Sequence, residues 1–303
     1  MSLAWALPLV IALEARSASV SPRPVAWAAQ SPRPAACQGS PGLWELSRQA
    51  RLGRRCRELA RAQALLLRAP EKAHARATQL LEQAPDFVAA RVVRGRARLR
   101  LGDTSGALAD LRPLAADDAG ELLEPAALLD GGRAALAERD LQSATRFYRL
   151  LGNRAALLPD TRDQIVAYVE VAATLLASGA AGVDEVQAFL REARRRSPGS
   201  GYTGLCASLS AVAWLSSGRE AEGQGALVEV GDRGALERFE KRDAVWLPDG
   251  MFDALMGVAL EKESPEAAAA HYRALAEGPL AGTAVGKLGA RPRAKDSGKR
   301  GAR

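Results

Sequence analysis

Aromatic residues and histidines are scarce in this chain of 303 residues. Phe, Trp and Tyr make up 5% of the sequence, and the only two histidines are His74 and His271. Neither has a Cys or an acidic residue at the i+4 spacing that a metal site on a helix uses. The Gly-x-Ser-x-Gly nucleophile motif, the phosphate-binding loop and the dinucleotide fingerprint are also absent. We therefore expect no catalytic residue, no metal site and no cofactor, and we predict that the protein is not an enzyme.

Cysteine is rare as well. The chain has three cysteines, Cys37, Cys56 and Cys206. No two of them have the short spacing of a metal knuckle or a redox motif, and the odd number excludes a framework in which every cysteine is bridged. A single Cys56–Cys206 bridge requires the two ends of the fold to meet, so we expect buried reduced thiols instead.

A long apolar run is also missing. The most apolar stretch near the N-terminus, Met1–Leu13, is too short to cross a bilayer as a helix, so the sequence predicts no transmembrane span. It is similar to the hydrophobic part of a secretory signal, although no Lys or Arg precedes it and Glu14 and Arg16 follow it. We interpret residues 1–28 as a signal peptide or N-terminal segment of an exported bacterial protein, on the periplasmic or extracellular side. The alternative is a cytoplasmic protein with an unstructured N-terminus.

Two further segments are poor in residues that can build a core. Residues 29–42 are rich in Pro and Ser and include the second of two Ser-Pro-Arg-Pro motifs, which predicts a linker. Residues 279–303 are rich in Gly, Lys and Arg, and the part from Lys287 to Arg303 carries +6 of the formal net charge of +7. We predict a basic, disordered C-terminal tail and a folded body that is close to neutral.

What the sequence does contain in abundance is Ala and Leu, which favour helices over strands. The clearest pattern lies in Ala90–Leu114, which predicts a helix, a turn at Gly102 and a second helix. A single helical hairpin cannot bury its own apolar face, so we expect copies of it on either side. A shift of 37 residues along the chain aligns Gly95 with Gly132. The sequence therefore predicts an all-α fold of repeated hairpins.

Eight residues of this stretch match a known repeat pattern. They are Gly95, Ala97, Leu99, Leu101, Gly102, Ala107, Leu111 and Leu114. The pattern resembles the tetratricopeptide repeat family, whose repeats are 34-residue helical hairpins. This resemblance implies an α-α superhelix, a solenoid of about six helical hairpins, over residues 43–278. Arg91 and Arg98 depart from the pattern, because they stand where the family has large apolar residues.

The expected hairpins differ in how closely they follow the pattern. The best is the one just described, and the later ones show little more than helical periodicity. Residues 233–248 have mixed charge and no clear partner, and we interpret them as a partial helix and a loop. The six expected hairpins lie at 43–84, 86–114, 125–158, 160–198, 203–231 and 251–278.

The resemblance also implies that the first helices line a concave groove and that Arg96 faces it. We predict that Ala89, Val92, Arg96 and Arg100 contact an acidic peptide or a partner helix through charge-assisted hydrogen bonds. The alternative is a solvated face on which arginine stems cover apolar surface. The predicted function is a non-catalytic protein–protein interaction scaffold.

Two other functions remain open at this point. The protein could be an adaptor whose basic tail binds nucleic acid or an anionic surface. Nucleic acid is not the expected partner, because the tail lacks aromatic residues that stack on bases. An α-barrel enzyme would hold two carboxylates across a cleft, but nothing in the sequence singles out such a pair from acids such as Glu124 and Asp163.

Overall fold

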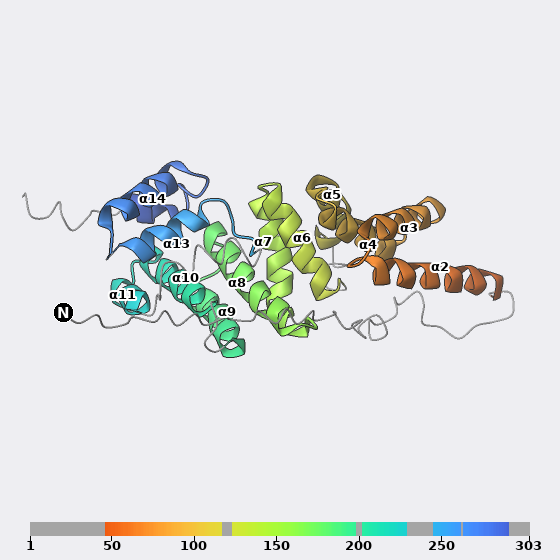
Figure 1. The fold of residues 1–303 in the computed structure, drawn as a ribbon, viewed down its shortest axis with the longest axis horizontal. Helices are drawn as coiled ribbons and strands as arrows, with labels where there is room; N and C mark the ends of the chain where they lie inside the picture. The colour runs from red at the N-terminus through yellow and green to blue at the C-terminus, as the bar shows by residue number, and fades with distance from the viewer. Residues whose placement is uncertain (1–45, 117–122, 198–201, 229–244, 262, 291–303) are drawn as a thin grey trace, which may run out of the picture. The chain divides into compact units, whose positions relative to one another are not determined.

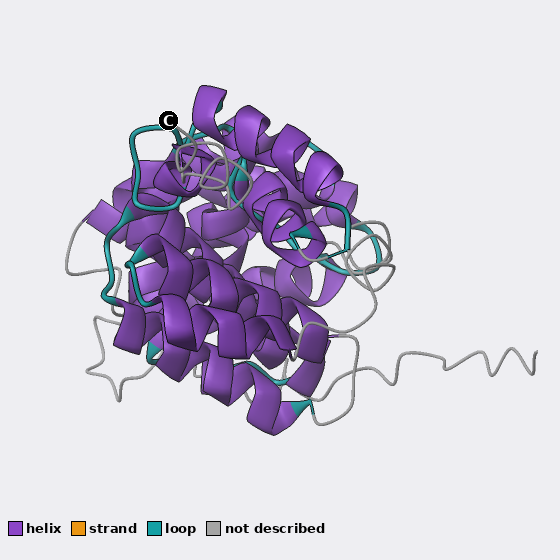
Figure 2. Ribbon diagram, turned by 90° about the vertical axis from the view of Figure 1, so that its left-hand side faces the viewer, coloured by secondary structure: helices purple, strands orange, loops and turns teal. Residues whose placement is uncertain are grey.

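The computed structural model describes residues 46–116, 123–197, 202–228, 245–261 and 263–290. These residues form twelve α-helices and two short 3-10 helices, and they contain no β-strand (Figures 1 and 2). The predicted all-α class is therefore confirmed. No helix in these ranges is both long and apolar enough to cross a membrane. The predicted signal segment at 1–28 and the predicted linker at 29–42 lie outside the described residues.

Consecutive helices pair into six hairpins, the number that the sequence predicts. Pro70, Pro125 and Pro265 each stand at the start of a helix, where the first N–H groups have no partner within the helix anyway. The 3-10 helix η4 (Ala155–Leu157) follows the third hairpin and η5 (Gly286–Ala290) follows the last. The hairpins are α2 (Leu46–Leu65) with α3 (Pro70–Gln83), α4 (Val88–Arg100) with α5 (Thr104–Ala116), α6 (Pro125–Ala137) with α7 (Leu141–Gly152), α8 (Thr161–Ser178) with α9 (Val183–Arg196), α10 (Tyr202–Ser216) with α11 (Glu220–Val228), and α13 (Met251–Leu260) with α14 (Pro265–Glu277).

The hairpins pack against one another in chain order, which makes the fold an all-α solenoid (Figure 1). The second helix of one hairpin contacts the first helix of the next, as α3 does with α4 and α7 with α8. First helices also contact one another, α2 with α4, α4 with α6, α8 with α10, and α10 with α13. We call α2, α4, α6, α8, α10 and α13 the first-helix layer, and we call their hairpin partners the second-helix layer.

Glycines on the first helices allow the two helices of a hairpin to approach closely. A Cβ atom placed on Gly132 of α6 would lie 2.6 Å from the ring of Tyr148 on α7. A Cβ atom placed on Gly95 of α4 would lie 2.9 Å from the side chain of Leu111 on α5. The two glycines that the 37-residue shift aligns therefore have the same packing role, and each faces a large side chain of the second helix.

The first prediction concerns this close approach. We expect Gly132→Ala to lower the free energy of unfolding by about 1–3 kcal/mol, because the new methyl group would meet the Tyr148 ring. That ring cannot step aside, since Tyr148 is fully buried and donates a hydrogen bond to Glu170.

Gly204→Ala in α10 is the matched control, because a Cβ atom there meets nothing within 4 Å. This variant should keep its stability or gain up to about 1 kcal/mol, since Ala favours a helix more than Gly. Urea denaturation followed by circular dichroism measures both variants. Equal stabilities would contradict the packing role of Gly132.

The structure corrects the boundary of the predicted C-terminal tail. Leu280, Val285 and Leu288 are 1%, 0% and 2% exposed, and η5 packs on α14 and α10. Residues 279–290 are thus part of the folded body, because three apolar side chains among glycines suffice to dock the segment. Residues 291–303 lie outside the described residues.

Proline inside a helix usually kinks or ends it, yet α5 continues past Pro113 to Ala116, with Leu111 and Leu114 packed on the core. The structure also decides the state of two cysteines. Cys206 is a free, fully buried thiol, so the Cys56–Cys206 bridge is not formed. Cys56 is disulfide-bonded, so the expectation of a reduced thiol is wrong for that residue. Burial raises the pKa of the Cys206 thiol to about 12 and keeps it protonated.

Candidate functional site

Arginines of the first-helix layer pair with carboxylates that lie one repeat further along the chain. Arg96 Nε of α4 donates to Asp130 Oδ2 of α6 over 2.7 Å, across 34 residues of sequence. Arg133 of α6 donates to both carboxylate oxygens of Glu170 on α8 over 3.0–3.2 Å, across 37 residues. We call these two contacts the repeat-spaced pairs. They connect three successive first helices, so charge as well as apolar packing fixes the stacking of the hairpins.

The four residues predicted to bind a partner do lie together on α4, but they are not equally accessible. Arg96 is only 5% exposed, because its guanidinium is drawn onto Asp130. Ala89 and Val92 are half-buried and pack against the hydrophobic core. The Arg100 side chain is 28% exposed and its guanidinium lies 3.8 Å from Asp130. Of the two predicted arginines, Arg100 is the one that still presents charge to solvent.

The two arginines that break the family pattern are also explained by their partners. Arg98 of α4 donates to Asp110 of α5 over 3.0 Å, and Arg94 donates to both oxygens of the same carboxylate over 2.6–2.9 Å. The hydrogen bond to Asp110 raises the pKa of Arg94. Arg91 donates to the carbonyl oxygen of Pro85 over 2.9 Å. A buried carboxylate between the helices therefore lets arginine occupy a position where an apolar residue is usual.

Glu170 is the centre of the polar contacts on this layer. It is 0% exposed and accepts hydrogen bonds from Arg133, from the Tyr148 hydroxyl over 2.9 Å and from the backbone N–H of Trp246 over 3.1 Å. Burial by itself lowers the pKa of the Arg133 guanidinium, but the Glu170 carboxylate raises it by more, so Arg133 stays protonated. Burial and the Glu170 charge raise the pKa of the Tyr148 phenol well above its usual value, so it remains a donor.

Trp246 belongs to a segment that comes from much later in the chain. The described residues just before α13, Val245–Asp249, form neither helix nor strand, and Figure 1 shows this part of the chain running from α13 towards α7 and α8. Val245, Trp246 and Leu247 are half-buried and pack against the main hydrophobic core. We call these residues the 245–249 segment.

The last residue of the 245–249 segment, Asp249, forms an ion pair. Asp249 Oδ2 lies 2.9 Å from Nε of Arg139, in the turn between α6 and α7. Arg139 has a φ of 57°, a left-handed conformation that is uncommon for a residue with a side chain. In the preceding hairpin the equivalent turn position is Gly102, with a φ of 81°. An arginine thus stands where the preceding hairpin has a glycine, and it forms an exposed ion pair with the segment.

The sequence did not reveal this site. Residues 233–248 were expected to be a partial helix and loop with no clear partner. Of these, residues 245–248 are described, and Trp246 contacts Glu170 of the first-helix layer. Residues 229–244 lie outside the described residues. A usable signal was present in α8, where Glu170 is the one charged residue within the buried run Ile165–Ala177. A lone acid inside such a run needs a buried cation, and Arg133 stands one repeat earlier.

The two histidines are not part of this site. His271 Nδ1 of α14 lies 2.9 Å from Asp253 Oδ1 of α13, which is a contact within the last hairpin. No group of three His, Cys, Asp or Glu side chains in the described ranges is close enough to hold a metal ion.

Comparison of the chain with models of known protein families and with curated proteins finds no match. What the first-helix layer can do must therefore be argued from its own geometry.

The second prediction tests the repeat-spaced pairs. Arg96→Met leaves the Asp130 carboxylate buried without its hydrogen-bond partner, and it should lower the free energy of unfolding by about 3 kcal/mol. The double variant Arg96→Met/Asp130→Leu should recover most of this loss, because an apolar pair of similar volume needs no charge compensation. A double-mutant cycle in urea measures the coupling. Additive losses would show that the two side chains do not depend on each other.

Proposed function

We propose that this chain is a non-catalytic scaffold whose first-helix layer binds extended segments of protein. The observation that carries the proposal is the 245–249 segment. It lies on this layer as a non-helical stretch, with its backbone N–H on Glu170, its side chains against the core and Asp249 on Arg139. Backbone hydrogen bonds combined with pockets for side chains are the way in which extended peptides are generally recognised.

The spacing of the contacts supports the resemblance to tetratricopeptide repeats. Arg96 and Asp130 are 34 residues apart, and so are Thr104 and Glu138, which also form a hydrogen bond. A 34-residue hairpin is the unit of that family. Peptide binding along the first helices is the function that this resemblance implies.

Around α4 and the start of α6, the first-helix layer keeps charged side chains that are partly exposed. Arg100 of α4 and Glu124, just before α6, have side chains that are 28% and 31% exposed. Val92 provides a half-buried apolar patch beside them. Arginines and carboxylates alternate here and largely neutralise each other, so we propose a partner with mixed charged and apolar side chains rather than a strongly acidic one.

The third prediction tests peptide binding directly. A random peptide library displayed on phage and panned on the full chain should enrich extended peptides that bind the first-helix layer. Arg100→Glu should weaken an enriched peptide about tenfold in fluorescence anisotropy, which is roughly 1.4 kcal/mol.

Arg146→Glu is the matched control. Arg146 is exposed on α7 of the second-helix layer, so its replacement changes the net charge equally but should leave binding unchanged. Failure to enrich any peptide would overturn the proposal, and so would equal losses in the two variants.

A further inference from the structure

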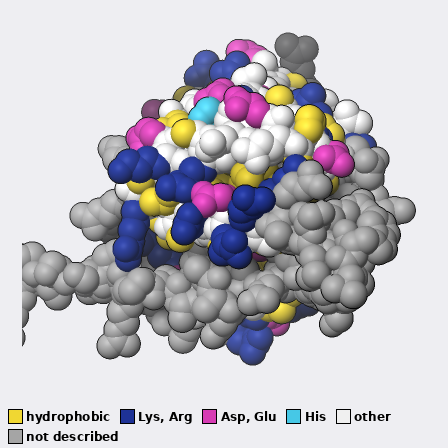
Figure 3. Space-filling model, turned by 90° about the vertical axis from the view of Figure 1, so that its right-hand side faces the viewer, with side chains coloured by type: hydrophobic (Ala, Val, Ile, Leu, Met, Phe, Trp, Pro, Cys, Tyr) yellow, Lys and Arg dark blue, Asp and Glu magenta, His cyan; other side chains and the backbone are white. Residues whose placement is uncertain are grey.

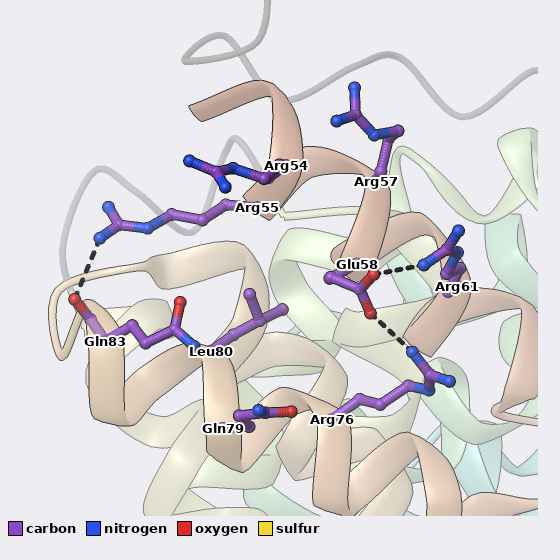
Figure 4. Close-up of a pocket in the computed structure, with 9 residues that line it drawn as sticks. All are labelled: Arg54, Arg55, Arg57, Glu58, Arg61, Arg76, Gln79, Leu80 and Gln83. Carbon is purple, nitrogen blue, oxygen red and sulfur yellow. Dashed lines mark hydrogen bonds and ion pairs between the residues drawn. The ribbon is translucent and has the colours of Figure 1, made fainter. Parts of the chain in front are cut away.

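A second feature of the molecule lies between the two helices of the first hairpin. α2 and α3 enclose a cavity of about 760 Å³ that opens to solvent (Figure 4). Among the described residues, five arginines surround it and Glu58 is the one carboxylate in its wall. The arginines are Arg54, Arg55, Arg57 and Arg61 of α2 and Arg76 of α3.

Both oxygens of the Glu58 carboxylate already accept hydrogen bonds. Glu58 accepts hydrogen bonds from Arg61 and, over 2.6 Å, from Arg76. Arg55 donates to the carbonyl oxygen of Gln83 over 3.1 Å. Figure 4 shows Glu58 between Arg61 and Arg76, so its charge is directed to these two and not to the rest of the wall.

The positive charges of Arg54 and Arg57 are not neutralised by any described residue. Both are exposed, and no described residue forms a hydrogen bond or an ion pair with either of them. They stand three residues apart on α2, so they lie on the same side of the helix. Figure 3, a view from the side of α2 and α3, shows Lys and Arg side chains gathered on this face. This differs from the first-helix layer around Asp130, where the arginines are paired.

We propose that this cavity binds an acidic segment of a partner protein, with Asp or Glu carboxylates seated at Arg54 and Arg57. Glu58 shows the mode of binding, because one carboxylate already lies between two guanidinium groups of this wall. The planar guanidinium fork matches the two oxygens of a carboxylate. No aromatic side chain among the described residues lines the cavity, so the described wall offers no platform for the stacking that single-stranded nucleic acids use.

This site lies between α2 and α3, whereas the peptide-binding surface proposed above involves α4, α6, α8 and the 245–249 segment. The cavity is proposed to bind an acidic partner, whereas the surface around Arg100 and Glu124 carries charges of both signs. Its failure would leave the scaffold proposal intact, and the scaffold proposal can fail without affecting it.

The fourth prediction uses the full chain and a fluorescein-labelled hexaglutamate peptide at an ionic strength of about 0.15 M, where the Debye length is about 8 Å. The double charge reversal Arg54→Glu/Arg57→Glu should weaken binding, measured by anisotropy, at least about tenfold. Both residues are exposed and have no partner among the described residues, so the variant should keep the circular dichroism spectrum of the unchanged chain.

The matched control is Arg146→Glu/Arg191→Glu, which reverses two exposed arginines of the second-helix layer. It has the same net charge, and both variants keep the basic residues 291–303, so a difference between them reports the cavity alone. We expect the control to bind within about twofold of the unchanged chain, as distant exposed charges are largely screened.

Three results would overturn the proposal. The first is no binding of hexaglutamate to the unchanged chain, and the second is an equal loss in the two double variants. The third is a short single-stranded oligonucleotide that binds more tightly than the peptide with the same dependence on Arg54 and Arg57, which would assign the cavity to nucleic acid instead.

Discussion

The buried carboxylate of Glu170 is the interaction on which much of this structure depends. A charge that is 0% exposed is stable only with several well-placed donors, and its donors come from three other parts of the chain. Arg133 ties α6 to α8, the Tyr148 hydroxyl adds α7, and the backbone N–H of Trp246 brings in the 245–249 segment. One side chain thus couples the stacking of two hairpins to the docking of a distant loop, and the surface proposed for peptide binding forms around it.

The arginines of the described residues divide into two groups with different consequences. Arg96 and Arg133 are matched by carboxylates one repeat later, and Arg94 and Arg98 are matched by Asp110 within their own hairpin, so these arginines act mainly within the fold. Arg54 and Arg57 of α2 are exposed, and no carboxylate of the described residues pairs with either of them. The same residue type therefore stabilises the middle of the array and leaves an attractive field for anions at α2 and α3.

The hairpins were predictable because each is a local feature. Helical periodicity, proline at helix starts and glycine at the turns act within a few residues, and the six expected hairpins match the six observed. The sequence missed features that depend on contacts between residues far apart in the chain. The docking of Leu280 and Leu288 needs the surfaces of α14 and α10, and the role of the 245–249 segment needs α8. The resemblance placed Arg96 on the groove, and its pairing with Asp130 could not be foreseen because that carboxylate stands 34 residues away.

The sequence by itself determined the all-α class, the number of hairpins and the glycine positions at which their helices approach closely. These follow from spacing along the chain, because an amphipathic helix and its turn are specified by adjacent residues. Only the tertiary structure decided which charges are neutralised and which remain free. The free energy of a buried ion depends on donors and acceptors within a few ångströms of it, and stacking brings those together from residues that are a repeat or more apart.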